Sequence, residues 1–212
     1  MAASDVETLR NKSLPQKINI FIWRAIKCKI RTRSELDKRG IDLNTLLCPL
    51  CDTEVEIVDH ILISCHNVKH IWHLPLKWWN FNTLNISNIE EAFVENQSVV
   101  DTLIGRSIWQ ATRWVCCYTI WKNRNNKIFS NKEWIPNKII TDIQTQSFDW
   151  ISKRLKKTSI KWHQWLITHH STHLRTNKEL SELALVKEAK DPKINRSVNR
   201  GRTILILQFI FI

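Results

Sequence analysis

CPLCDTEVEIVDHILISC, residues 48–65, places three cysteines and one histidine in a short segment. Cys48, Cys51, His60 and Cys65 have the spacing C-x2-C-x8-H-x4-C. A C-x2-C pair bends the backbone so that two sulfurs face one point, and zinc prefers tetrahedral thiolate and imidazole ligands. The second pair can point to the same side if the last helical turn between its members unwinds. The spacing therefore predicts a zinc site that joins a bent loop to a short helix.

Two alternatives to this ligand set remain open in the sequence. Cys48 and Cys51 could be loop thiols beside an ordinary helical His60, and His66 competes for the fourth ligand position. If all four predicted ligands bind, they leave no position for a water molecule, whereas a catalytic zinc keeps one position open. The expected cofactor is therefore a structural Zn²⁺.

The composition of the chain favours helices. Its 212 residues are 43% hydrophobic, with only 3 glycines and 5 prolines. Sandwiches, barrels and Rossmann folds need more turn residues than this. The 11 tryptophans mostly stand beside other apolar residues at helical spacing, so we expect most of them in the core. We predict an all-α fold: a small helical domain with a zinc knuckle, then a bundle of long helices and a disordered C-terminal tail.

Helical periodicity appears on both sides of the cysteine cluster. An apolar stripe with steps of three and four predicts a helix around residues 18–26. Thr32 with Glu35, and Thr53 with Glu56, have the capping-box spacing S/T-x-x-E, and the second pair should start the helix that carries His60. Pro75 is expected to end a short helix.

Two longer helices are expected further along the chain. The first covers residues 98 to about 129, with an apolar stripe that includes Ile108, Ala111 and Val115. The second starts near Pro136, because proline is favourable in a first helical turn. We therefore divide the chain into residues 14–80 (zinc-binding domain), 81–166 (helical region) and 167–212 (disordered tail).

The net charge of +12 is unevenly distributed. Residues 46–75 carry one lysine and four acids, whereas residues 1–45 carry ten basic and five acidic residues, and residues 122–161 carry ten and three. A polyanion should therefore contact the flanking segments. The predicted nucleic-acid-binding residues are Arg31, Arg33, Lys38, Arg39, Lys122, Arg124, Lys127, Lys153, Arg154, Lys156 and Lys157. Trp78 and Trp79 are candidate stacking platforms, although core packing is the more ordinary role for them.

The cysteines also indicate a cellular environment. The first 17 residues contain no apolar run typical of a signal peptide, and no stretch is long enough to span a membrane. We therefore expect a protein that is not secreted and works inside the cell, in nucleus or cytoplasm. In reducing surroundings clustered cysteines favour a metal over disulfides. Cys28, Cys116 and Cys117 lie on helical stretches and are expected to be buried thiols.

A resemblance to a known family supports the metal site. The segments LPQKINIFIWRAIKCKIRTRSELDKRGI and CPLCDTEVEIVDHILISC, with Trp72 after them, resemble the reverse transcriptase zinc-binding domain of plant non-LTR (LINE-type) retrotransposons. IWKNRNNKIF, PNKIITDIQTQSFDWISKR and WHQWL are similar to the region downstream of this domain in plant copies, so the resemblance covers residues 14 to about 166. It implies that Cys48, Cys51, His60 and Cys65 bind zinc.

The resemblance also implies a function beside a polymerase. We expect a non-catalytic module that contacts RNA or DNA with little sequence preference, as an accessory to reverse transcription, with a reverse transcriptase in trans as a further partner. The alternative is a structural or protein-interaction remnant in which zinc only stabilises the fold. No Asp-Asp pair occurs in the chain, and no ribonuclease H carboxylate set is recognisable. The expected protein is therefore not an enzyme.

Overall fold

A computed structural model of the chain describes residues 10–78, 88–94, 103–154, 161, 162 and 165. All of them lie in the first of the two units into which the chain divides, residues 1–174. The elements are α1 (Gln16–Ile26), α2 (Arg33–Asp37), the π-helical turn η1 (His60–Ser64), α3 (His66–Trp78), α4 (Ile89–Val94), α5 (Leu103–Ser130) and α6 (Pro136–Arg154). Within the described ranges there is no strand, only an isolated bridge between Leu47 and Val55. The predicted all-α fold is confirmed.

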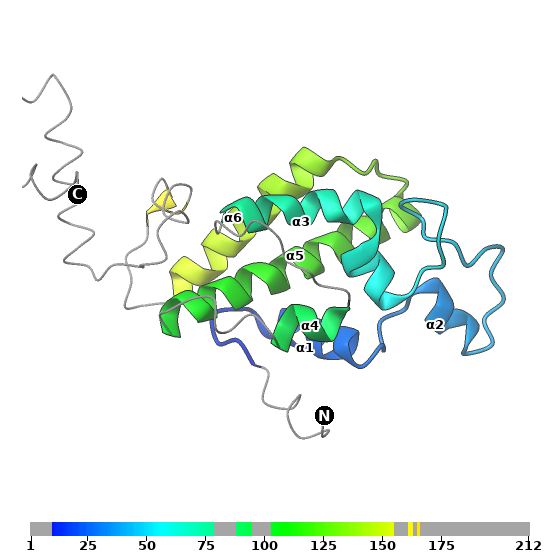
Figure 1. The fold of residues 1–212 in the computed structure, drawn as a ribbon, viewed down its shortest axis with the longest axis horizontal. Coiled ribbons are helices and arrows are strands. Elements are labelled where there is room, and N and C mark those ends of the chain that lie inside the picture. The colour runs from blue at the N-terminus through cyan, green and yellow to red at the C-terminus, as the bar shows by residue number, and fades with distance from the viewer. Residues whose placement is uncertain (1–9, 79–87, 95–102, 155–160, 163–164, 166–212) are drawn as a thin grey trace, which may run out of the picture. The chain divides into compact units, whose positions relative to one another are not determined.

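Helix α5 is the central element of the fold. It contacts α6, α1, α3 and η1, and it lies between α1 and α6 in Figure 1. Its middle part is buried on nearly all sides, with Trp109, Trp114 and Ile120 fully enclosed. The enclosed residues also include the polar Thr112 and the charged Arg113, so α5 is a core helix although its circumference is not wholly apolar. The predicted stripe of Ile108, Ala111 and Val115 is thus one part of a wider buried surface.

Helix α1 packs one face against α5, as its sequence predicts. The buried residues of α1 are those of the apolar stripe: Ile18, Phe21, Ile22, Ala25 and Ile26. Phe21 meets the ring of Tyr118 edge-on, with the ring centroids 5.6 Å apart. Burial of this stripe, rather than intrinsic helix propensity, stabilises so short a helix.

The helix cap predicted at Thr32 and the start of the last helix are confirmed. The Glu35 backbone N–H donates to Thr32 Oγ1 over 3.3 Å, which satisfies one of the free donors at the start of α2. Gly40 comes after that helix with φ +76°, a conformation in which other side chains are strained. Pro136 is the first residue of α6.

Three local predictions are wrong. Pro75 lies inside α3 and is buried, because packing of the surrounding residues outweighs the lost hydrogen bond. Thr53 and Glu56 do not cap a helix, since Glu56 is fully buried and its carboxylate binds other groups. Cys28 is exposed, because α1 ends at Ile26 and the chain turns there with φ +50° at Cys28.

Some predictions fall outside the described residues. These are the disordered tail at residues 167–212, the start of the long helix at residues 98–102, and the ring of Trp79. The side chain of Trp78 is also outside the described part of the chain. The domain boundaries at residues 14, 80 and 166 stay predictions.

Candidate metal centre

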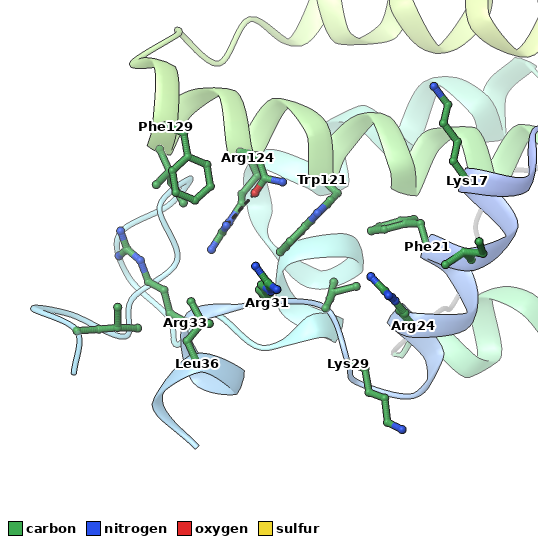
Figure 2. A pocket seen from close by; sticks show the side chains of 15 residues that line it. Lys17, Phe21, Arg24, Lys29, Arg31, Arg33, Leu36, Trp121, Arg124 and Phe129 are labelled. Carbon is green, nitrogen blue, oxygen red and sulfur yellow. Dashed lines mark hydrogen bonds between the residues drawn. The ribbon is translucent and has the colours of Figure 1, made fainter. Parts of the chain in front are cut away.

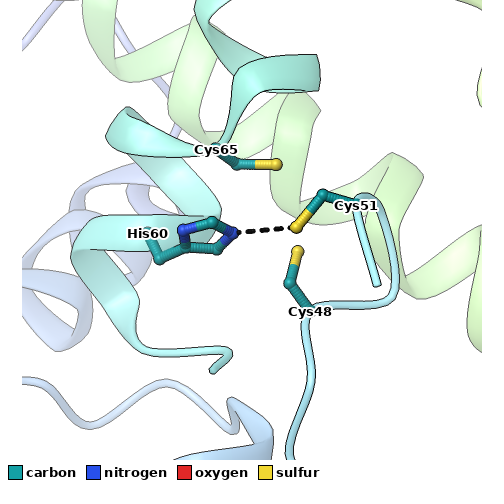
Figure 3. Close-up of side chains that lie close together, drawn as sticks. All are labelled: Cys48, Cys51, His60 and Cys65. Carbon is teal, nitrogen blue, oxygen red and sulfur yellow. Dashed lines mark hydrogen bonds between the residues drawn. The ribbon is translucent and has the colours of Figure 1, made fainter. Parts of the chain in front are cut away.

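The first two candidate ligands stand on a tight hairpin. The Leu47–Val55 bridge closes it, and the Cys48 N–H donates to the Glu54 carbonyl over 2.7 Å. The Asp52 N–H donates back to the Cys48 carbonyl over 2.8 Å, with Asp52 at φ +56°. This left-handed residue folds the chain back after Cys51, so that both sulfurs of the C-x2-C pair face the same point (Figure 3).

The second pair stands at the two ends of the π-helical turn η1. The Cys65 N–H donates to the His60 carbonyl over 2.9 Å, a hydrogen bond between residues five apart. In an α-helix, residues five apart point in clearly different directions, because one turn takes 3.6 residues. The wider turn brings both side chains to the same side. π-Turns of this kind occur frequently at functional sites.

The four side chains form one compact cluster. The three Sγ atoms and one imidazole nitrogen of Cys48, Cys51, His60 and Cys65 all lie within 4.8 Å of one another. Ligand atoms held by zinc at about 2.0–2.3 Å in a tetrahedron are about 3–4 Å apart. Cys48, His60 and Cys65 are buried, and Cys51 is half-buried. The cluster is positioned to hold a metal ion, and three sulfurs with one imidazole are a donor set that zinc prefers.

The pKa values of the three clustered thiols depend on one another and on nearby hydrogen bonds. Hydrogen bonding to Cys65 and burial raise the pKa of Cys48, while the same hydrogen bond lowers the pKa of Cys65. Burial would raise the pKa of Cys51, but hydrogen bonds from the side chain and backbone of Thr53 outweigh it, and the pKa is lowered. The lowered pKa values of Cys51 and Cys65 favour loss of the thiol proton, which metal binding requires.

The imidazole of His60 is oriented by groups on both of its nitrogens. Nε2 lies 3.3 Å from Cys51 Sγ, and Nδ1 lies 3.2 Å from Glu54 Oε2, at an angle that does not make a hydrogen bond. Burial opposes a charged ring, but the neighbouring thiols of Cys51 and Cys48 raise the pKa of His60 overall. Histidines that bind a metal usually donate their second ring N–H to a carboxylate, and Glu54 is the carboxylate within reach of Nδ1 here.

The remaining cysteine and histidine candidates stand apart from the cluster. His66 begins α3, is exposed, and is not among the clustered side chains. Cys116 and Cys117 are buried in α5, as predicted, and burial raises the pKa of Cys117 to about 12. The four residues of the original pattern are thus the set that the fold brings together.

Glu56 connects the hairpin to the central helix, a role that no sequence pattern indicates. Its carboxylate accepts hydrogen bonds from Arg124 Nε and Nη2, over 2.6 and 2.5 Å, and from the Arg33 N–H over 2.9 Å. Its own N–H donates to the Leu46 carbonyl. Arg33 Nη1 also donates to the Leu47 carbonyl, over 2.6 Å. The residues before and after the C-x2-C loop are therefore held by charged groups.

The predicted nucleic-acid-binding residues fall into four groups: exposed, partly buried, outside the described residues and, for Arg124 alone, buried. Six are exposed: Arg31, Lys38, Arg39, Lys122, Lys153 and Arg154. Two of these make surface ion pairs, Lys38 with Glu35 at 2.7 Å and Lys153 with Asp149 at 2.5 Å. Arg33 and Lys127 are partly buried, and Lys156 and Lys157 lie outside the described residues.

Arg124 has a different role from the predicted one. Only 3% of the residue is exposed, and its guanidinium is bound by Glu56 and lies over the ring of Trp121. A guanidinium in this position is not available to a phosphate at the surface. The sequence could not show this, because the two partners are 68 positions apart.

One of three comparisons with known proteins, the comparison with protein-family models, supports this site. Neither the curated proteins nor the solved structures gave a match. Among the described helices, none combines the length and apolar character that a membrane span requires. Residues 3–72 match the family model described as zinc-binding in reverse transcriptase, and the whole Cys48–Cys65 cluster lies inside that range. Residues 3–72 are therefore similar to the zinc-binding domain of reverse transcriptases.

Proposed function

We propose that Cys48, Cys51, His60 and Cys65 bind one structural Zn²⁺ in a non-catalytic module that contacts RNA or DNA as an accessory to reverse transcription. The cluster of the four side chains and the family match support the zinc part of this proposal. We also propose that the chain originates from a plant non-LTR retrotransposon. Its protein partner would be a reverse transcriptase supplied in trans. The place of action would be the nucleus or the cytoplasm.

The role of the metal follows from the two elements that it would join. With four protein ligands, zinc keeps no open position for a substrate, so it would act as a cross-link between the hairpin and η1. Apolar burial stabilises the hairpin only in part, since Leu47, Val55 and Ile57 are all partly exposed (38%, 48% and 46%). Zinc binding would thus supply folding free energy for residues around 46–65.

The observation that carries the nucleic-acid part is the attachment of a basic segment to the hairpin. Arg33 is hydrogen-bonded to the hairpin through its backbone and its side chain. It lies between exposed Arg31 and the exposed pair Lys38 and Arg39. The hairpin would therefore fix the backbone from which these cations reach solvent. Cations in a fixed arrangement bind a phosphate backbone with little dependence on sequence.

A salt titration tests this function directly. Zinc-loaded full-length protein would be titrated against fluorescently labelled single-stranded RNA at several salt concentrations, with anisotropy as the readout. We expect the affinity to fall as salt rises, with a log–log slope of about −0.7 for each phosphate contacted. Absence of binding at micromolar protein, or an affinity that does not change with salt, would contradict the nucleic-acid proposal.

The alternative is a module for protein contact, in which zinc only stabilises the fold. One observation favours it: the partly exposed Leu47, Val55 and Ile57 place apolar surface on the hairpin. Under this alternative, zinc would bind and stabilise the chain, but the labelled RNA would not bind. The same titration therefore separates the two functions.

A further inference from the structure

A pocket with a strongly basic lining lies between α1, the segment after it, α2 and the C-terminal part of α5 (Figure 2). Its volume is about 760 Å³. The cationic residues that line it are Lys17, Arg24, Lys29, Arg31, Arg33 and Arg124, and none of the described residues in the lining is acidic. Cations gathered in a concave surface raise the local potential and attract anions. The positive charge of the lining therefore favours a polyanion as the ligand of this pocket.

Two cations of the pocket, which we call its wall, are held by other groups of the protein. Three others, which we call its rim, are exposed to solvent. Arg124 is held by Glu56, and the Arg33 guanidinium is held by the Leu47 carbonyl. Arg24, Lys29 and Arg31 are exposed. In Figure 2, Arg31 lies near the centre of the view, with Arg24 on the α1 side and Arg33 on the α2 side. The rim cations are the ones that a ligand can reach.

Aromatic rings complete the lining. Trp121 is partly buried: its ring centroid is 6.2 Å from that of Phe21, and the Arg124 guanidinium lies 4.7 Å from the ring. Phe129, in the last turn of α5, is instead 77% exposed. An aromatic ring left in water beside cations is the arrangement that single-stranded nucleic acids use, with phosphates on the cations and a base on the ring.

We propose that this pocket is the binding site for a single-stranded nucleic acid, with phosphates on Arg24 and Arg31 and a base stacked on Phe129. The inference rests on the proposed nucleic-acid function and locates it. A duplex offers its phosphates on a convex surface and keeps its bases stacked inside, so it cannot use both the concave pocket and the ring. An acidic peptide would bind the cations but has no base to place on Phe129.

The metal hairpin supports one wall of this site. Glu56, at the end of the hairpin, binds both Arg124 and the Arg33 N–H, and these two arginines form that wall. Loss of the hairpin would release both side chains. The affinity for single strands should therefore fall when zinc is removed, although no ligand of the metal touches the pocket.

The test uses zinc-loaded full-length protein and a labelled RNA of about ten nucleotides, since comparable sites cover about 4–16. We expect Arg24→Ala with Arg31→Ala to reduce the magnitude of the salt slope by about 1.4, because each lost phosphate contact removes about 0.7. Phe129→Ala should weaken binding about 5- to 150-fold with an unchanged slope, and Phe129→Trp should retain the affinity.

The matched control is Lys69→Ala with Lys138→Ala, which removes the same charge from exposed positions on α3 and α6 outside the pocket. This double variant should keep most of the affinity. Circular dichroism melting of every variant shows whether the fold is retained. If the control and the pocket variants lose affinity equally, the pocket is not the site.

Further outcomes distinguish failure of the pocket from failure of the function. Wild-type protein that binds RNA, with pocket variants that bind equally well, overturns the pocket alone. Wild-type protein that does not bind RNA overturns the proposed function and the pocket together. A duplex of the same sequence that binds as tightly, or a poly-glutamate peptide that displaces the RNA at equal concentration, overturns the assignment to single strands.

Discussion

Glu56 and Arg124 face each other with two parallel hydrogen bonds, 2.6 and 2.5 Å long, at a place where neither side chain is more than 3% exposed. One residue ends the metal hairpin and the other lies in the last third of α5. A bidentate pair of this kind is directional as well as strong. It fixes the hairpin against the central helix at one defined point.

Breaking this pair should be costly. Glu56→Gln leaves the Arg124 guanidinium buried without its counter-charge, and we expect a loss of about 3–5 kcal/mol in the free energy of unfolding. Urea denaturation of zinc-loaded protein would measure it. Asp149→Asn is the control, because it breaks the surface pair with Lys153 and should cost less than about 1 kcal/mol. If both changes lowered the free energy of unfolding equally, the buried pair would stabilise the fold no more than the surface pair does.

Removing the metal should destabilise the same region. At a zinc concentration about 1,000 times its Kd, binding adds about 4 kcal/mol of stability, which corresponds to about 8–16 °C in Tm for a chain of this size. A chelator or Cys48→Ser should remove this increment, and native mass spectrometry should show the loss of one zinc. Cys28→Ser is the control, since this exposed thiol is outside the cluster. An unchanged Tm in chelator would refute the metal site.

Zinc affinity should fall as the pH falls. The raised pKa of Cys48, caused by its hydrogen bond with Cys65 and by burial, keeps this thiol protonated in the metal-free protein at neutral pH. Binding must release that proton, so the affinity should change by about tenfold per pH unit for each proton released. Competition titrations with a chromogenic chelator at several pH values between about 6 and 8 would measure the slope. An affinity independent of pH would contradict ligation by Cys48.

Thiol accessibility gives a fourth prediction. In zinc-loaded protein, N-ethylmaleimide should modify Cys28 alone, because the buried Cys116 and Cys117 have raised pKa values and the other cysteines bind metal. Mass spectrometry should find one adduct, and three more after addition of chelator. Cys28→Ser should have none before chelation. Rapid modification of Cys51 in the presence of zinc would indicate that it is not a ligand.

Several periodic and local signals in this chain predicted the structure correctly. The stripe of α1 is buried residue for residue, Thr32 accepts the predicted hydrogen bond, and Pro136 starts α6. Such signals act within a few residues, where sequence spacing determines geometry. The metal ligands belong to the same class, because eighteen consecutive residues contain them all.

Long-range pairing was not accessible from the sequence. Glu56 has the spacing of a helix cap, and Arg124 stands among basic residues that favour a nucleic-acid contact. Both interpretations use only neighbouring residues in the sequence. In the structure, the two side chains form a buried ion pair with each other instead. Pro75 was misjudged for a similar reason, since tertiary packing around α3 outweighs the intrinsic cost of proline. The pocket, too, depends on residues from four separate segments.

The hydrogen bond from the Cys65 N–H to the His60 carbonyl joins residues five positions apart. It constrains the number of residues between the two ligands more than it constrains their identity. Replacing Ile61 or Ile63 by another apolar residue would leave the reach between imidazole and thiol intact. Deleting a single residue there would turn the wide loop of backbone into an ordinary helical turn and rotate Cys65 away from its partners. Homologous segments that share this centre should therefore vary in sequence between the two ligands but not in the number of residues.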